Sequence, residues 1–109
     1  MSSEQVVKIS ADAFNETIKE GVVLVDFWAT WCGPCRMLGP VVDRVAEELR
    51  EDQVTVAKYD IDEGKVVATD LNITSIPTII VFKDGVEVER LHGATHRQAE
   101  LVALCKKHI

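Results

Sequence analysis

Hydrophobic residues along the chain follow two alternating patterns, one typical of buried strands and the other of amphipathic helices. Short runs rich in β-branched residues predict strands at 5–9, 22–29, 54–59, 78–83 and 86–90. The run at 22–29 is almost continuously apolar, which is typical of a strand buried on both faces. Asp84 and Gly85 separate the last two runs, and this dipeptide favours a tight β-hairpin.

Helical spacing of apolar residues predicts two helices in the first half of the chain. The first covers about 11–20, with Ser10 as its N-cap. The second begins after Cys32 and contains Pro40, which lacks the backbone N–H that a helix interior needs, so we expect a kink there. Its apolar positions recur every three or four residues: Leu38, Val41, Val42, Val45 and Leu49.

Two more helices are predicted in the second half. One covers 63–71. The other runs to about residue 108, and Thr95 and Gln98 form a capping box for its start. The element order is therefore β-α-β-α-β-α-β-β-α, in which strands joined by helices are expected to pair in parallel and the final hairpin adds an antiparallel edge. This order predicts one α/β domain, residues 1–109, with a mixed five-stranded sheet flanked by four helices.

Composition and charge narrow the possible functions. The 109 residues are 47% hydrophobic and 28% charged, with a net charge of −6, which is ordinary for a globular domain. An acidic chain without a basic stripe is a poor nucleic-acid binder, and no apolar run approaches the ~20 residues that span a bilayer. The first residues lack the pattern of a secretory signal. We expect a cytoplasmic monomer that binds neither nucleic acid nor membranes.

Two of the three cysteines lie close together, at positions 32 and 35. They fall where a buried strand ends and a helix begins, and the free N–H groups of a helix N-terminus stabilise a thiolate. Cys32 at the cap is therefore predicted to be a nucleophile, and Cys35, one turn further, a shielded resolving thiol. Pro34 is tolerated in the first helical turn. The pattern predicts a redox dithiol.

A zinc site is the alternative use of these cysteines. Zinc needs four ligands, and Cys105 with His108 provides a second pair. This pair lies on the terminal helix, and nothing in the sequence places it against Cys32. Cys105 alone fits better as a small core residue beside Leu101 and Leu104.

Asp26 interrupts the apolar run of the second strand. Burial disfavours a charged carboxylate, so its pKa should be raised unless it is paired. The carboxyl either orders the core through hydrogen bonds or accepts and donates protons beneath the dithiol. Lys58, on the following strand, is the expected charge partner.

Pro77 precedes a buried strand and marks either a turn or a cis peptide bond. A cis Ile76–Pro77 bond would bring a free backbone edge against the dithiol. An ordinary proline at the start of a strand is the other interpretation, and the sequence alone leaves both open.

Over nearly its whole length the chain resembles the thioredoxin family. The segment Asp-Phe-Trp-Ala-Thr-Trp-Cys-Gly-Pro-Cys at 26–35 is similar to the family's active-site signature, and Lys58, 76–78, 82–85 and 93–94 match later landmarks in order. The resemblance implies a thioredoxin fold and a general protein-disulfide reductase that carries electrons. In it the Cys32 thiolate attacks a target disulfide, Cys35 resolves the mixed disulfide, and Asp26 takes the proton of Cys35.

The resemblance also implies the roles of neighbouring residues and partners. Gly33 and Pro34 tune the dithiol toward reduction, Pro77 is cis, and a shallow groove for an extended target is lined by Trp31, Ile76, Pro77 and Gly93. The chain binds no cofactor, its redox group being the Cys32–Cys35 disulfide. A thioredoxin reductase supplies the electrons, and disulfide-containing proteins receive them.

His92 departs from the family pattern, which usually has an apolar residue there. It is either a neutral groove residue of similar bulk or a cation in mild acid that stabilises the Cys32 thiolate. Two other functions stay open, because a fold does not fix function. One is a binding module or complex subunit on the same fold, and the other is a more oxidising disulfide isomerase.

Overall fold

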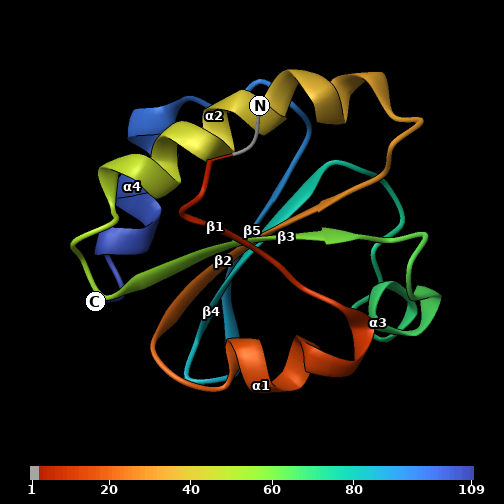
Figure 1. Cartoon of the computed structure of the whole chain (residues 1–109), viewed down its shortest axis with the longest axis horizontal. Coiled ribbons are helices and arrows are strands. Elements are labelled where there is room, and N and C mark those ends of the chain that lie inside the picture. Colours follow the sequence, from red (N-terminus) through yellow and green to blue (C-terminus); the bar gives the residue numbers. More distant parts are fainter. Residues whose placement is uncertain (1–2) are drawn as a thin grey trace.

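The computed structural model describes residues 3–109. In it, five strands form one sheet in the order β1-β3-β2-β4-β5 (Figure 1). β1 and β2 pair in parallel with β3, whereas β4 is antiparallel to β2 and β5 is antiparallel to β4. The predicted mixed five-stranded sheet is confirmed. The strands are β1 Val6–Lys8, β2 Val22–Trp28, β3 Val54–Asp60, β4 Thr78–Lys83 and β5 Val86–His92.

Helices cover both faces of the sheet. α2 and α4 lie on one face, and α1 and α3 lie on the other (Figure 1). A short 3₁₀ turn, Ala11–Ala13, precedes α1. Within residues 3–109 the four α-helices are α1 Phe14–Ile18, α2 Gly33–Glu48, α3 Lys65–Asp70 and α4 Gln98–Lys106.

The central position of β2 in the sheet explains its apolar sequence. Val22 and Leu24 point into the core under α2 and α4, while Val23 and Val25 point into the core under α1 and α3. Successive side chains of a strand alternate between faces, so a strand covered on both sides needs apolar residues at every position. Asp26 follows this alternation onto the α2 side of the sheet, where its carboxyl group is buried.

The hairpin at Asp84 and Gly85 is confirmed. Both residues have positive φ, 51° and 84°, as a two-residue hairpin turn requires. The turn is fastened to the start of β2, because Gly21 N–H donates to Oδ1 of Asp84 over 2.8 Å and Asp84 N–H donates to the carbonyl of Gly21 over 3.0 Å.

The expected parallel pairing of every helix-linked strand is wrong for β4. α3 has only six residues and rises about 9 Å, whereas the seven residues of β3 span about 23 Å. A helix of this length covers only part of the sheet, and the chain between β3 and β4 stays at the edge where β3 ends. β4 starts at the edge where β2 and β3 end, with Thr78 opposite Phe27, and the preceding loop is placed at that edge.

One of the two predicted N-cap positions is confirmed and the other is wrong. Ser10 is the N-cap residue of the 3₁₀ turn that leads into α1, although its side chain makes no capping hydrogen bond. α4 starts after Arg97, so Thr95 lies outside its N-cap position. The side-chain Nε2 of Gln98 donates instead to Oε1 of Glu48 on α2 over 2.8 Å. Gln98 therefore makes a contact between α4 and α2 in place of the predicted capping box within α4.

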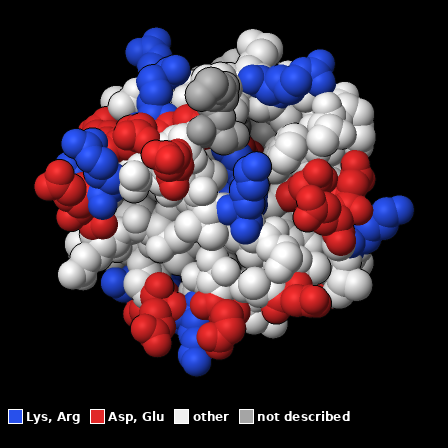
Figure 2. Space-filling model, viewed as in Figure 1, with Lys and Arg blue, Asp and Glu red and all other residues white. Residues whose placement is uncertain are grey.

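The surface charges are mixed. On the face drawn in Figure 2, lysine and arginine side chains lie interspersed with groups of aspartate and glutamate, without a continuous basic stripe. In the part of the chain from residue 3 onward, no helix has the length and hydrophobicity needed to cross a bilayer.

Candidate active site

Cys32 and Cys35 form a disulfide at the N-terminus of α2, with their Cα atoms 5.3 Å apart. Cys32 occupies the N-cap position with extended backbone angles, φ −92° and ψ 109°, and Pro34 lies in the first turn. This arrangement arises because β2 ends at the sheet edge and α2 starts within a few residues. The predicted dithiol therefore lies at a strand-to-helix junction.

The backbone of α2 directs a donor at the first sulfur. The N–H of Cys35 donates to Sγ of Cys32 over 3.2 Å. A sulfur held at a helix N-terminus by such a donor is stabilised as an anion once the disulfide is reduced. Cys32 and Cys35 are only 5% and 3% exposed, so an incoming target must approach along the loops around Cys32.

One of these loops contains the cis peptide bond predicted before β4. Ile76–Pro77 is cis, and the carbonyl oxygen of Ile76 lies 3.9 Å from Sγ of Cys32. Ile76 also packs against a small buried cluster that contains Ala29 and both cysteines. The sequence prediction that this backbone segment lies against the dithiol is confirmed.

A second loop, after β5, is joined to the first. The N–H of Gly93 donates to the carbonyl of Pro77 over 3.0 Å, and Gly93 has φ of 89°, which glycine adopts most easily. His92 and Thr78 are opposite each other in the β4–β5 pair. The residues predicted to line a target groove are thus at the same edge of the sheet as Cys32, although their binding role stays a prediction.

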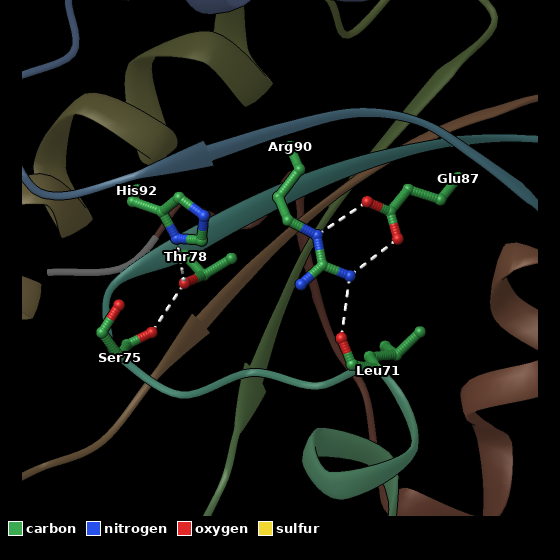
Figure 3. A network of polar contacts seen from close by, with 6 residues as sticks. All are labelled: Leu71, Ser75, Thr78, Glu87, Arg90 and His92. Carbon is green, nitrogen blue, oxygen red and sulfur yellow. Dashed lines mark hydrogen bonds and ion pairs between the residues drawn. The ribbon is translucent and has the colours of Figure 1, made fainter.

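Figure 3 shows the polar contacts that fix these two loops. The hydroxyl of Thr78 donates its single proton to the carbonyl of Ser75 over 2.6 Å. Nδ1 of His92 lies 3.2 Å from the same hydroxyl oxygen, so a hydrogen bond there requires the proton to be on Nδ1. Neutral His92 then has its free lone pair on Nε2. Farther along β5, Arg90 joins Glu87 to the carbonyl of Leu71.

Trp31 lies beside Cys32. Its large apolar side chain is 66% exposed. Its indole N–H donates to Oδ2 of Asp62 over 2.7 Å. Asp62 follows β3, and its contact with Trp31 was not predicted from the sequence. Its signal was only its position after a strand that ends at the same edge of the sheet as β2.

Asp26 is buried on β2, 1% exposed, and Oδ1 has no hydrogen-bond partner among residues 3–109. Burial raises the pKa of this carboxyl to about 7; Lys58 lowers the pKa and Asp43 raises it. Asp26 and Cys35 both line a pocket of about 360 Å³. A carboxyl with this pKa exchanges protons at neutral pH, which is the property that acid–base chemistry requires.

Lys58 is not joined to Asp26 as the sequence suggested. The two residues are in register on β3 and β2, but Nζ of Lys58 lies 3.0 Å from Oδ1 of Asp43 on α2. Asp43 was not predicted from the sequence. An acidic residue next to the buried stripe of α2 was its only signal, because helix spacing does not indicate which strand residue it meets.

The residues of the possible zinc site do not gather. Cys105 is fully buried in the core beside Leu101, and burial raises the pKa of its thiol to about 12. His108 contacts Glu89 on β5. Across residues 3–109 no group of three or more histidine, cysteine or acidic side chains is arranged to hold a metal. Cys105 is the core residue that the sequence predicted.

Comparison with known sequences identifies relatives that span nearly the whole chain. The family model described as Thioredoxin matches residues 5–107. A thioredoxin of Chlamydia muridarum is 49% identical over 100 residues, which are 92% of this chain and 95% of the relative. A thioredoxin of Staphylococcus haemolyticus is 41% identical over 104 residues, 95% of this chain and 98% of the relative.

Solved structures give the same picture. The crystal structure of Malassezia sympodialis thioredoxin has a TM-score of 0.80 and 38% identity, covering 94% of this chain and 90% of that one. A mutant thioredoxin from Halobacterium salinarum has a TM-score of 0.83 and 33% identity, covering 99% and 95%. The similarity therefore includes the sheet, the helices and the segment that contains both cysteines.

Proposed function

Because this chain belongs to the thioredoxin family, we propose that Cys32 is its attacking sulfur and Cys35 its resolving sulfur. The chain is a protein-disulfide oxidoreductase that acts by thiol–disulfide exchange. The observation that carries the assignment of roles is the Cys32–Cys35 disulfide at the start of α2, where the Cys35 N–H is directed at the Cys32 sulfur.

The first step is attack by the Cys32 thiolate on one sulfur of a target disulfide. The target S–S bond breaks, a new bond forms between Cys32 and the target, and the other target sulfur leaves as a thiolate that takes up a proton. The helix N-terminus and the Cys35 N–H favour the anion that starts this step. No oxidant or reductant other than the two sulfur pairs is needed.

The second step releases the target. Asp26 accepts the proton of Cys35, the resulting thiolate attacks Cys32, and the second target sulfur leaves as a thiolate that takes up a proton. The target has then gained two electrons and two protons, and Cys32 and Cys35 are again joined. A carboxyl whose pKa is about 7, lining the same pocket as Cys35, supports this role because it holds and releases a proton at neutral pH.

Target recognition is proposed for the edge formed by Trp31, Ile76, Pro77, His92 and Gly93. The exposed indole of Trp31 and the Ile76 backbone beside the Cys32 sulfur support binding of an extended segment by short backbone pairing. Gly33 and Pro34 are proposed to tune the dithiol toward reduction, as the family resemblance implies.

The electron source is proposed to be a thioredoxin reductase, with disulfide-containing proteins as electron acceptors. Any flavin or nicotinamide belongs to that reductase, and this chain's redox group is its own cysteine pair. We propose a cytoplasmic location, since a disulfide reductase needs a compartment whose electron supply keeps its thiols reduced.

Insulin reduction with dithiothreitol as electron donor tests this function. The wild type should accelerate the reaction, whereas Cys35→Ser should stop turnover and leave Cys32 joined to insulin. Cys105→Ser is the matched control, because Cys105 is buried in the core away from the site, and it should retain activity. Turnover by Cys35→Ser at the wild-type rate would refute the assigned roles.

Equilibration with glutathione separates a reductase from the more oxidising isomerase. The reduction potential of a reductase's cysteine pair is more negative than that of an isomerase's pair, so glutathione disulfide oxidises the reductase more completely. A reduction potential in the isomerase range would mean that this chain is the more oxidising isomerase on the same fold.

A further inference from the structure

Lys58 is held by α2. Its ammonium lies 3.0 Å from Oδ1 of Asp43 and 3.4 Å from the carbonyl oxygen of Gly39. The Lys58 and Asp43 side chains are only 12% and 14% exposed. Two acceptors from one rigid helix therefore fix the ammonium in a largely buried position.

Asp26 lies beside this ion pair without joining it. It is the register partner of Lys58 across β2 and β3, yet its Oδ1 has no partner within residues 3–109. Asp26, Asp43, Lys58 and Cys35 all line one pocket. The remaining charged residues that line this pocket come from β1, the start of α2, the end of β3 and the loop after it: Lys8, Arg36, Asp60 and Glu63.

An ammonium near two carboxyl groups favours the ionised form of the one that it contacts more closely. The contact here is with Asp43, so Asp26 receives only the longer-range attraction of Lys58. We propose that Asp43 is a positioning residue that holds the Lys58 ammonium on α2 and thereby keeps Asp26 available to accept and release a proton at neutral pH. The proposal deepens the proposed function, since it rests on Asp26 serving Cys35.

The electrostatics of the pocket agree with this arrangement. Burial, the largest effect, raises the pKa of Asp26 to about 7, Lys58 lowers it and Asp43 raises it further. A direct ion pair with an ammonium typically lowers a carboxyl pKa by roughly 1 to 3 units. If Lys58 turned to Asp26, the carboxyl would therefore become a weaker base for the Cys35 proton.

A purely structural role for the pair predicts something different. Asp43 and Lys58 also join α2 to β3, and loss of one partner of a buried pair is destabilising. That role alone would change the free energy of unfolding and leave the titration of Asp26 unchanged. The titration of Asp26 is therefore the decisive measurement.

The test is an NMR titration of the Asp26 side-chain carboxyl carbon in ¹³C-aspartate-labelled oxidised protein. Asp43→Asn should lower the titration midpoint of Asp26 by roughly one pH unit, because it removes a negative charge and releases Lys58. Glu63→Gln is the matched control, since it removes a carboxylate of the same pocket that does not contact Lys58, and it should shift the midpoint much less. An unchanged midpoint in folded Asp43→Asn would overturn the proposal.

The Lys58→Met background shows whether Asp43 acts through Lys58. There, Asp43→Asn should shift the midpoint by less than half of its effect in the wild type. An equal shift in both backgrounds would mean that Asp43 acts on Asp26 only through direct repulsion between the two carboxylates. That result would overturn the positioning role.

A measurement on the wild type keeps the proposal testable if Asp43→Asn does not fold. The hydrogen-bond coupling between ¹⁵Nζ of Lys58 and the Asp43 carboxyl carbon should persist on both sides of the Asp26 midpoint. Loss of that coupling when Asp26 ionises would show that Lys58 moves to Asp26, and would overturn the proposal. These readouts need no disulfide turnover, so they stand apart from the insulin test.

Discussion

The backbone N–H of Cys35 donates to the sulfur of Cys32 across 3.2 Å. The relationship follows from the helix: a residue at the N-cap accepts from the free N–H three positions later. In an ordinary N-cap the acceptor is an oxygen that stabilises the fold. Here it is a sulfur, and the same geometry prepares that atom to carry negative charge in the reduced protein.

Cys32 should therefore react quickly with iodoacetamide in the reduced protein. At pH 7 we expect its alkylation rate to exceed that of free cysteine by at least about tenfold, since helix N-termini increase the thiolate fraction. Mass spectrometry of the alkylated peptides measures each site. Cys105, which is fully buried, should react only after unfolding. Equal rates for Cys32 and free cysteine would contradict thiolate stabilisation by α2.

Replacing Asp26 by Asn should stabilise the oxidised protein at neutral and alkaline pH. The Asp26 carboxyl titrates near 3.8 when unperturbed and near 7 in the folded protein. Between these values the folded state binds a proton that the unfolded state has lost, so wild-type stability falls as pH rises from about 4 to about 7. The difference corresponds to at most about 4 kcal/mol above pH 7.

Urea unfolding at pH 4, 5.5, 7 and 8 measures this effect. Asp26→Asn should be about 2 to 4 kcal/mol more stable than the wild type at pH 8, and the two proteins should converge toward pH 4. Parallel stability curves would mean that Asp26 does not titrate in this range.

The same substitution should slow the release of target. If Asp26 takes the proton of Cys35, Asp26→Asn should reduce the single-turnover rate on a disulfide peptide at least about tenfold near pH 8. The wild-type rate should rise as pH increases through about 7, where Asp26 ionises, and the variant should lack this rise. Stopped-flow measurements from pH 5.5 to 9 give both profiles. A variant with the wild-type profile would remove Asp26 from the mechanism.

Thr78→Val tests the contacts between the two loops beside Cys32. Thr78 is buried and contacts both the Ser75 carbonyl and His92. Valine has a similar shape but leaves these groups without a partner, which should cost about 1 to 3 kcal/mol of unfolding free energy. Insulin reduction should also slow, because Ser75 precedes the Ile76–Pro77 segment.

The matched control is Thr74→Val, since Thr74 is exposed in the same loop. It should change stability by less than about 0.5 kcal/mol. If both variants lose the same stability, the Thr78 hydroxyl contributes nothing specific.

Local sequence patterns determined much of this protein. The apolar run of β2 predicted a strand buried on both faces, because every side chain of such a strand meets a core. Asp84 and Gly85 predicted the hairpin, since both adopt positive φ at low cost. The position of Cys32 and Cys35 between a strand and a helix predicted the redox pair, because neighbouring residues in sequence generate that geometry.

Contacts between distant segments were decided only by the tertiary structure. The short helix α3 leaves the chain at the edge of the sheet where β3 ends, and β4 runs antiparallel from that edge, which brings Ile76 to Cys32. Lys58 is in register with Asp26, but its ammonium forms an ion pair with Asp43, because α2 packs over β3 at this point. Periodicity states which face of an element is buried, whereas partners on that face depend on how whole elements pack.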